Sequence, residues 1–286
     1  MRILITGAKG QLGQELQRTA PPDAVLLALD SGGLDITRAD AVEQVAANFR
    51  PDLIINAAAY TAVDKAESDA DKAYAVNADG AGNLATVAAG RGARLIHVST
   101  DFVFNGKQST PYQPEDAADP LGVYGASKWE GEKRVGEISG GQALILRTAW
   151  VHSAYGANFV KTMLRLMAER DSLGVVADQI GTPTWARTLA QAIWAAAAKP
   201  ALQGVYHWTD AGVASWYDFA VAIQEEALAL GLLQREIPVR PICTQDYPTP
   251  ARRPAYSVLD KSKSWADLDL APIHWRQGLR EMLTEL

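Results

Sequence analysis

The chain has 286 residues, a length that allows two domains or one large one. Its 27 basic and 33 acidic residues give a formal net charge of −6, which argues against nucleic acid as a partner. Hydrophobic residues make up 48% of the chain and charged residues 21%, so a disordered protein is excluded. The single cysteine, Cys243, excludes an intramolecular disulfide and a cysteine-based metal cluster.

The N-terminal residues lack the apolar stretch of a signal peptide, and no run approaches the roughly 18 apolar residues of a membrane span. We therefore expect a cytoplasmic protein without a membrane partner.

Short apolar runs alternate with longer amphipathic segments through the first half of the chain. We predict strands at 2–6, 25–30, 53–57, 94–99 and 143–147, and helices at 11–19, 38–49, 70–90 and 123–140. This alternation is typical of βαβ units. It predicts an α/β protein with a Rossmann-like, doubly wound parallel sheet that is covered on both faces.

The second half of the chain is less regular. Helices are predicted at 159–170, 188–199, 216–231 and 275–286, while five prolines favour an extended or looped segment over 237–255. We expect an NAD(P)-binding domain over residues 1–150 and a smaller, mainly substrate-binding α/β domain over 151–286. A strand near 204–208 is expected to return to the first sheet.

A glycine-rich turn follows the first predicted strand and opens a helix. Gly7, Gly10 and Gly13 give the spacing G-x-x-G-x-x-G, which lets a pyrophosphate approach the backbone at a helix N-terminus. Asp30 closes the next strand and suits a ribose 2′-hydroxyl, whereas Lys9 suits a 2′-phosphate. The sequence therefore predicts a nicotinamide cofactor and leaves NADH and NADPH open. An ordinary glycine-rich turn is the alternative.

Two polar segments lie near the same predicted sheet edge. Asp35 and Ile36 follow the second strand, where Asp35 can also serve as a helix cap. Small residues at 57–59 end the third strand and leave space for a flat ring, although they also suit tight helix packing. Residues 99–101 close the fourth strand, where the Thr100 hydroxyl can meet a substrate oxygen or cap a turn.

Tyr124 and Lys128 stand four residues apart in a predicted helix, so both lie on one face. An ammonium group near the phenol is expected to lower the tyrosine pKa from about 10 and to support proton transfer. A pair on a helix surface is the alternative.

These features occur together and in order, and the chain resembles the extended short-chain dehydrogenase/reductase superfamily. Within it, the chain is most similar to the dTDP-4-dehydrorhamnose reductase family. The segments that carry this similarity span nearly the whole chain: TAVDKAESD (61–69), VNADG (76–80), STDFVFNG (99–106), VYGASKWEGE (123–132), RTAWVH (147–152), NFVKTMLRL (158–166), DQIGTPT (178–184) and YPTPARRP (247–254).

The resemblance implies reduction of the 4-keto group of a dTDP-4-keto-6-deoxy sugar by NADPH or NADH, for cell-surface polysaccharide. It implies Tyr124 as proton donor, Lys128 as the residue that holds the nicotinamide ribose, and Thr100 as the residue that fixes the carbonyl. Cofactor contacts are implied for Gly10, Gln11, Leu12, Asp30, Asp35, Ile36, Ala59, Tyr60 and Thr61. Substrate contacts are implied for Thr100, Asp101 and Trp150.

Three further positions are candidates on their chemistry. Arg252 and Arg253 lie in a proline-flanked segment and suit a diphosphate, although a solvated basic turn would look the same. Trp150 follows the fifth strand and can form a wall of the sugar site or pack in the core. His97 lies inside the fourth strand and is expected to be structural.

Some members of the family bind Mg²⁺ between subunits through three glutamates. Glu15 and Glu285 match two of these positions, but the third is Arg187, and a cation is no magnesium ligand. The sequence therefore predicts no metal site, with Arg187 in place of the ion, and either a monomer or a homodimer.

Two other functions remain open. A related sugar-nucleotide epimerase or dehydratase would use the same cofactor, but dehydratases of this superfamily usually carry a glutamate where Phe102 stands. A non-catalytic NAD(P)-binding regulatory subunit would keep the fold with a weakened catalytic set, whereas Thr100, Tyr124 and Lys128 are all intact.

Overall fold

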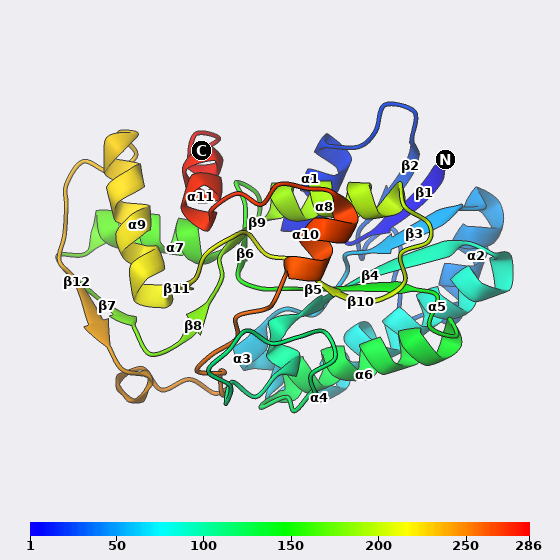
Figure 1. Ribbon diagram of the computed structural model, residues 1–286, viewed down its shortest axis with the longest axis horizontal. Helices are drawn as coiled ribbons and strands as arrows, with labels where there is room; N and C mark the ends of the chain where they lie inside the picture. Colours follow the sequence, from blue (N-terminus) through cyan, green and yellow to red (C-terminus); the bar gives the residue numbers. More distant parts are fainter.

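The computed structural model describes residues 1–286 and centres on a six-stranded sheet (Figure 1). All neighbouring strands in this sheet run parallel. Their order across the sheet is β10 (Gly204–His207), β5 (Leu144–Thr148), β4 (Arg94–Thr100), β3 (Leu53–Asn56), β1 (Arg2–Thr6) and β2 (Val25–Leu29). The strand order reverses next to β1, the point at which open α/β sheets bind ligands.

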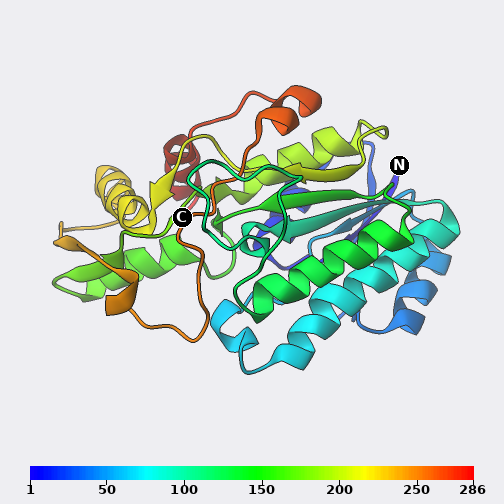
Figure 2. The ribbon, with the colours of Figure 1, turned by 60° about the horizontal axis from the view of Figure 1, so that its bottom comes forward.

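Helices cover both faces of the sheet (Figure 2). One face packs against α1 (Gln11–Arg18), α8 (Ala186–Ala197) and α10 (Ser262–Leu268). The other face packs against α2 (Ala39–Phe49), α5 (Gly80–Arg91) and α6 (Val123–Ile138). Central strands are therefore apolar on both sides, and all four residues of β3 are buried. The predicted α/β class with a doubly wound parallel sheet is confirmed.

The remaining helices form a second core at the carboxyl edge of the sheet. It is built from α7 (Phe159–Glu169), α9 (Trp216–Ala229) and α11 (Trp275–Leu283). Three two-stranded pairs connect these helices: β6 (Val151–His152) with β9 (Thr184–Trp185), β8 (Ile180–Gly181) with β11 (Ala214–Ser215), and β7 (Leu173–Val176) with β12 (Val239–Ile242). We call this part the C-terminal layer.

Three details differ from the expectations. The helix expected over 70–90 is divided into α4 (Ala70–Tyr74), a π-helical turn (Ala75–Asp79) and α5. The proline-rich segment contains strand β12 and a 3₁₀ turn (Thr244–Asp246), and α10 forms where no helix was predicted. Two short elements complete the chain, α3 (Val63–Ala66) and a 3₁₀ turn (Asp101–Val103).

Strand β10 pairs with β5, as the sequence led us to expect of the segment near 204–208. Helices α8 and α10 also pack on the sheet although they follow residue 150. The domain limits themselves stay a prediction. None of the helices combines the length and apolar character that crossing a membrane requires.

Candidate active site

The glycine loop leaves the start of α1 open to a ligand. Gly7 has φ +74°, and a Cβ atom there would lie 2.6 Å from the Ala57 carbonyl oxygen, so only glycine fits. Gly10 precedes α1 without any side-chain cap, and amide groups of the first turn, from Gln11 and Leu12 onward, point outward unpaired. This backbone fits the pyrophosphate of a dinucleotide.

Asp30 stands at the end of β2 opposite this loop. Its Oδ1 accepts hydrogen bonds from the amides of Gly32 and Gly33, and its carboxylate pairs with Lys9. The Lys9 ammonium lowers the pKa of Asp30, helped by the Gly33 amide. Both side chains line an open cavity of about 590 Å³ between α1 and β2. The pair thus offers either a carboxylate or an ammonium group to a ribose.

Asp35 and Ile36 follow this cavity in the chain. Asp35 Oδ1 accepts from the Thr37 amide at 3.0 Å and from the Thr37 hydroxyl at 2.8 Å, so it closes a turn. It does not cap α2, because the N-cap residue of that helix is Arg38, three residues further along the chain. Ile36 is buried, and its carbonyl accepts from Asn83 of α5 at 2.9 Å.

A chain of buried polar side chains runs beneath the glycine loop. Thr6 donates to Asn56 Oδ1 at 2.7 Å, and the same oxygen accepts from the Ala58 amide at 3.1 Å. Asn56 Nδ2 bonds to His97 Nδ1 at 3.0 Å across the sheet. Burial lowers the pKa of His97 well below its usual value, so the ring is neutral. His97 is structural, as expected.

Asn77, which the sequence analysis did not single out, connects the loop after β3 with α6. Its Oδ1 accepts from the Tyr60 amide at 2.8 Å, while Nδ2 donates to the Tyr60 carbonyl at 3.1 Å and to the Ser127 hydroxyl at 3.0 Å. The π-helical turn brings this side chain between the two segments. Asn77 therefore fixes the loop that carries Ala59, Tyr60 and Thr61 against the helix that carries Lys128.

Thr100, Asp101 and Tyr124 come together at the carboxyl end of β4. The Thr100 hydroxyl donates to Asp101 Oδ1 at 3.0 Å and accepts from the Phe102 amide at 3.2 Å. The Tyr124 ring meets Phe102 edge to face, with centroids 5.5 Å apart. Asp101 is buried and its Oδ2 has no partner. Burial raises the pKa of Asp101 to about 6, although the nearby Ser257 hydroxyl and the hydrogen bond from Thr100 lower it.

The expectation that Lys128 lowers the pKa of Tyr124 is wrong for this structure. Burial raises the pKa of Tyr124 to about 12, although a hydrogen bond with Thr100 works in the opposite direction. The Lys128 ammonium donates to the Val98 carbonyl at 2.7 Å and does not contribute to the Tyr124 shift. Burial also lowers the pKa of Lys128 to about 8. The effect of phenolate desolvation on the pKa of Tyr124 thus outweighs any effect of the Lys128 charge.

Two contacts that no sequence spacing indicates hold α6 in place. Arg147 of β5 and Glu132 of α6 form a buried pair, with Nε and Oε1 3.0 Å apart. At the start of the helix, Glu67 Oε1 accepts from the Val123 amide at 2.9 Å, one residue before Tyr124. The tyrosine therefore sits on a helix that is fixed at its first residue and at its third turn.

The remaining substrate candidates follow β5 or lie in the proline-rich segment after β12. Trp150 is half-buried, has φ +47° and stacks on Trp216, with centroids 3.5 Å apart. Arg253 is already paired with Asp64, with Nη2 2.8 Å from Oδ2, whereas Arg252 is exposed and forms no ion pair. Of the two arginines, only Arg252 is free for a diphosphate in this structure.

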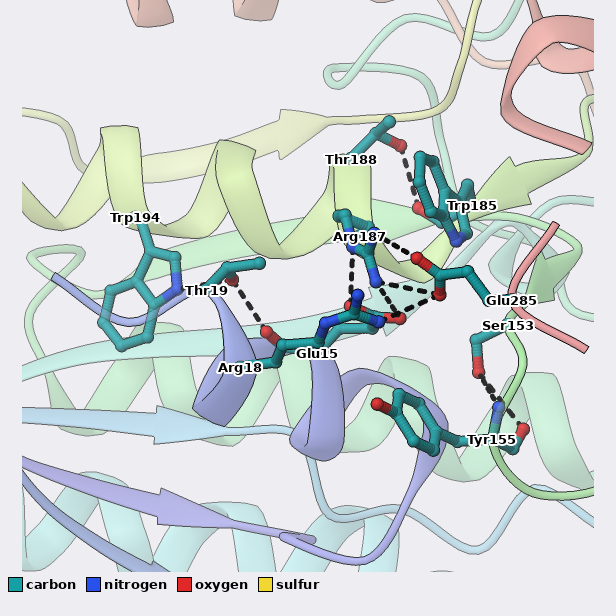
Figure 3. Close-up of polar contacts among 10 residues, drawn as sticks. All are labelled: Glu15, Arg18, Thr19, Ser153, Tyr155, Trp185, Arg187, Thr188, Trp194 and Glu285. Carbon is teal, nitrogen blue, oxygen red and sulfur yellow. Dashed lines mark hydrogen bonds and ion pairs between the residues drawn. The ribbon is translucent and has the colours of Figure 1, made fainter. Parts of the chain in front are cut away.

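Arg187 lies between Glu15 and Glu285 within one chain (Figure 3). Its Nε is 3.0 Å from Glu15 Oε2 and its Nη2 is 2.9 Å from Glu285 Oε2, which also accepts from Arg18. No group of three or more His, Cys, Asp or Glu is placed to hold a metal ion. Mg²⁺ requires oxygen ligands, and here a guanidinium group stands between the two carboxylates where the ion would have to bind. The site therefore does not fit Mg²⁺.

Several proteins resemble the chain along its whole length. The dTDP-4-dehydrorhamnose reductase of Aggregatibacter actinomycetemcomitans is 46% identical, with 98% of each chain covered. The Bacillus subtilis spore coat polysaccharide biosynthesis protein SpsK is 40% identical, over 99% of this chain and 97% of that one. The Thermus thermophilus UDP-glucose 4-epimerase, at 20% identity and a TM-score of 0.84 over 99% of this chain and 98% of that one, shares the fold alone.

Among solved structures, the Bacillus anthracis dTDP-4-dehydrorhamnose reductase in complex with NADP aligns with a TM-score of 0.94 and 39% identity, over 100% of this chain and 99% of that chain. A family model described as the RmlD substrate binding domain matches residues 1–286. The chain therefore belongs to the dTDP-4-dehydrorhamnose reductase family.

Proposed function

We propose that this protein uses NADPH or NADH to reduce the 4-keto group of dTDP-4-dehydro-β-L-rhamnose. The product would be dTDP-L-rhamnose, a precursor of cell-surface polysaccharide. The observation that carries the proposal is the cluster of Thr100, Tyr124 and Lys128 at the carboxyl end of β4, in a full-length member of this family. The same residues are the proposed catalytic set.

The first turn of α1 holds the pyrophosphate through its free amides, with Gly7, Gly10 and Gly13 lining the turn. Asp30 or Lys9 meets the adenosine ribose, and Asp35, Ile36 and the loop after β3 border the adenine and nicotinamide halves. Lys128 would hold the nicotinamide ribose through its ammonium group. When bound, the reduced cofactor supplies a hydride to the carbonyl carbon.

Tyr124 supplies the proton. With a pKa raised to about 12, the phenol is fully protonated at neutral pH and can donate its O–H proton to the carbonyl oxygen as negative charge develops there. The Thr100 hydroxyl favours the phenolate left behind when it turns its hydrogen from Asp101 to Tyr124. Lys128, as an ammonium group, stabilises the same charge once it turns from the Val98 carbonyl.

The substrate occupies the space between β4 and the C-terminal layer. Thr100 and Asp101 contact the reacting end of the sugar, Trp150 forms a wall, and Arg252 faces the diphosphate, joined by Arg253 when its pair with Asp64 opens. Residues 1–150 with the strand near 204–208 form the cofactor-binding domain, and residues 151–286 mainly bind the substrate.

Location in the cytoplasm and assembly as a monomer or homodimer are also part of the proposal. The exposed, free thiol of Cys243 supports a reducing compartment, and the net charge of −6 supports the absence of a nucleic-acid partner.

The direct test follows NADPH absorbance while the purified protein is mixed with the dTDP-4-keto sugar. We expect one NADPH oxidised for each 4-keto group lost, and a product that is two hydrogens heavier. A product of unchanged mass, formed without net NADPH oxidation, would instead identify an epimerase. NADPH binding without any conversion of the sugar would identify a non-catalytic subunit.

A further inference from the structure

Trp150 has a backbone conformation that bulky residues rarely adopt. Three non-glycine residues have positive φ, and two of them, Arg50 and Asp269, are the left-handed residues that end helices α2 and α10. Trp150 ends no helix, because it lies between β5 and β6. A positive φ at such a residue costs about 1–3 kcal/mol, so its surroundings must hold it in place.

Trp216 holds the indole from one side. The two rings are 3.5 Å apart between centroids and tilted by 6°. Trp216 is the first residue of α9, and a capping box fixes it: the Ser215 amide donates to Asp218 Oδ2 at 2.9 Å, and the Asp218 amide donates to Ser215 Oγ at 3.0 Å. The stacking partner therefore has little freedom to move.

Gly181 holds the indole from its edge. A Cβ atom at this position would lie 2.6 Å from Trp150 Cε2, a separation that real side chains do not tolerate. Its backbone φ is not positive, so space for the ring, and not backbone freedom, requires the glycine. Gly181 also pairs with Ala214 across strands β8 and β11, and β11 leads directly into Trp216. The pair of strands β8 and β11 thus positions both residues that contact the Trp150 indole, Gly181 and Trp216.

The ring lies beside the catalytic edge, at the margin of the core of the C-terminal layer, against which both indoles pack. Trp150 follows Thr148, whose register partner on β4 is Thr100. Gln11 of the first turn of α1 contacts the carbonyl of the next residue, Val151, at 3.4 Å. Trp150 and Trp216 both keep some exposed surface, whereas Trp185 and Trp275 of the C-terminal layer are buried. A fixed, partly exposed indole at this place offers a flat apolar surface to a ligand.

We propose that Trp216 and Gly181 are positioning residues that hold Trp150 as a rigid wall against the sugar of the nucleotide substrate. This inference rests on the proposed function. Because Trp216 and Gly181 confine the ring before the ligand arrives, binding loses less side-chain entropy than it would with a free indole. Neither residue touches the reacting atoms, so both act on substrate affinity and not on the chemical step.

The experiment combines circular dichroism with substrate kinetics. Two parallel indoles this close couple their electronic transitions, and their couplet should disappear in Trp216→Ala and Trp150→Phe alike. We expect Trp216→Ala to raise KM for the keto sugar roughly three- to tenfold, with kcat within about twofold and KM for NADPH unchanged. Trp216→Phe should restore most of the affinity, because a phenyl ring can still stack. Gly181→Ala should weaken the couplet and raise KM.

Trp265→Phe is the matched control, since this tryptophan lies in α10, away from the wall, and should leave the couplet and KM unchanged. Binding of dTDP-L-rhamnose, measured by calorimetry, tests the wall without turnover. A couplet that survives Trp216→Ala, or a lost couplet with unchanged sugar-nucleotide affinity, overturns the inference. A wild-type protein that binds the sugar nucleotide tightly but never reduces the keto sugar contradicts the proposed function instead.

Discussion

Two buried aspartates show how the catalytic edge differs from the C-terminal layer. Asp101, after β4, has one carboxyl oxygen without a partner, and Ser99 Oγ and Thr148 Oγ1 beside it are also unpartnered. Asp210 has both oxygens occupied, Oδ1 by the Thr188 hydroxyl and Oδ2 by the Trp185 amide at 2.9 Å. Asp101 therefore keeps hydrogen-bonding capacity for a ligand, whereas Asp210 has used its capacity on the protein's own structure.

Charged groups also differ in how fully the protein itself pairs them. Arg187 is saturated by Glu15 and Glu285, and Glu226 by Arg276 and Arg280. Lys128 bonds only to a backbone carbonyl and is free to exchange it. A side chain that acts on a ligand must stay in place while its polar group remains able to change hydrogen-bond partners. Five predictions test this difference, from the largest expected effect to the smallest.

Tyr124→Phe should abolish most turnover and leave NADPH binding nearly intact. The loss of a proton donor costs roughly 10²–10⁴ in rate, and the phenyl ring keeps the contact with Phe102. Steady-state kinetics and a cofactor titration measure the two effects. Near-normal turnover by the pure variant would remove Tyr124 from the chemistry.

Arg187→Ala should destabilise the fold by about 3–5 kcal/mol, because it leaves the fully buried Glu15 carboxylate without its guanidinium partner. Arg165→Ala is the matched control: its pair with Glu169 is 60% and 55% exposed and should cost less than about 1 kcal/mol. Urea unfolding measures both. Equal losses would mean that Arg187 contributes no more than a surface charge.

EDTA should change neither activity nor assembly, since Arg187 stands where an ion would be needed. Sedimentation with and without EDTA tests this point, and dissociation of a dimer would contradict it. Arg187→Glu is the reciprocal variant, because a third carboxylate should create assembly that depends on magnesium.

The pH dependence of the free energy of unfolding should reveal the raised pKa of Asp210. Burial raises the pKa of Asp210 from 3.8 to about 7, so the folded protein keeps a proton that the unfolded chain loses, and stability falls between these pH values. His152 works oppositely, because burial lowers its pKa to about 4. Unfolding of wild type and Asp210→Asn, compared from pH 4 to 7, isolates the aspartate. The variant should gain relative to wild type as pH rises; a constant difference would contradict the raised pKa.

Asp30→Ala should shift cofactor preference toward NADPH by about tenfold, because it removes a carboxylate that repels a 2′-phosphate and frees Lys9 to meet it. The ratio of kcat/KM for NADPH and NADH measures the shift. Lys9→Ala should move the ratio the other way. An unchanged ratio in both variants would place the pair away from the ribose.

The sequence predicts the structure best where apolar residues recur at the regular spacing of a strand or a helix. The parallel strands and their helices follow from apolar runs and helical spacing, and the glycine loop follows from its position after β1. The paired strands β6, β8, β9 and β11 have two residues each and so no period to detect. Helix α10 has seven residues and follows a proline-rich segment, so its signal was equally weak.

Contacts between distant positions account for what the sequence did not show of the candidate site. Asp64 neutralises Arg253 from 189 residues away, and Asn77 reaches Ser127 only because of a π-helical turn inside an otherwise regular helix. The Tyr124 pKa depends on burial, which the spacing of Tyr124 and Lys128 does not contain. Composition and periodicity predict the helices and strands, but not which residues each side chain contacts in the folded protein.

The late arrival of β10 and α8 in the sheet has a consequence for biosynthesis. When the first 150 residues have left the ribosome, β5 is still an unprotected edge strand, and the face that α8 later covers exposes apolar side chains such as Ile3, Ile5 and Leu16. The face can be covered only after residue 197 has been translated, and the edge of β5 only after residue 207. The nascent chain therefore passes through an aggregation-prone stage that chaperones would need to shield, and its slowest folding step is expected to be the docking of these late segments.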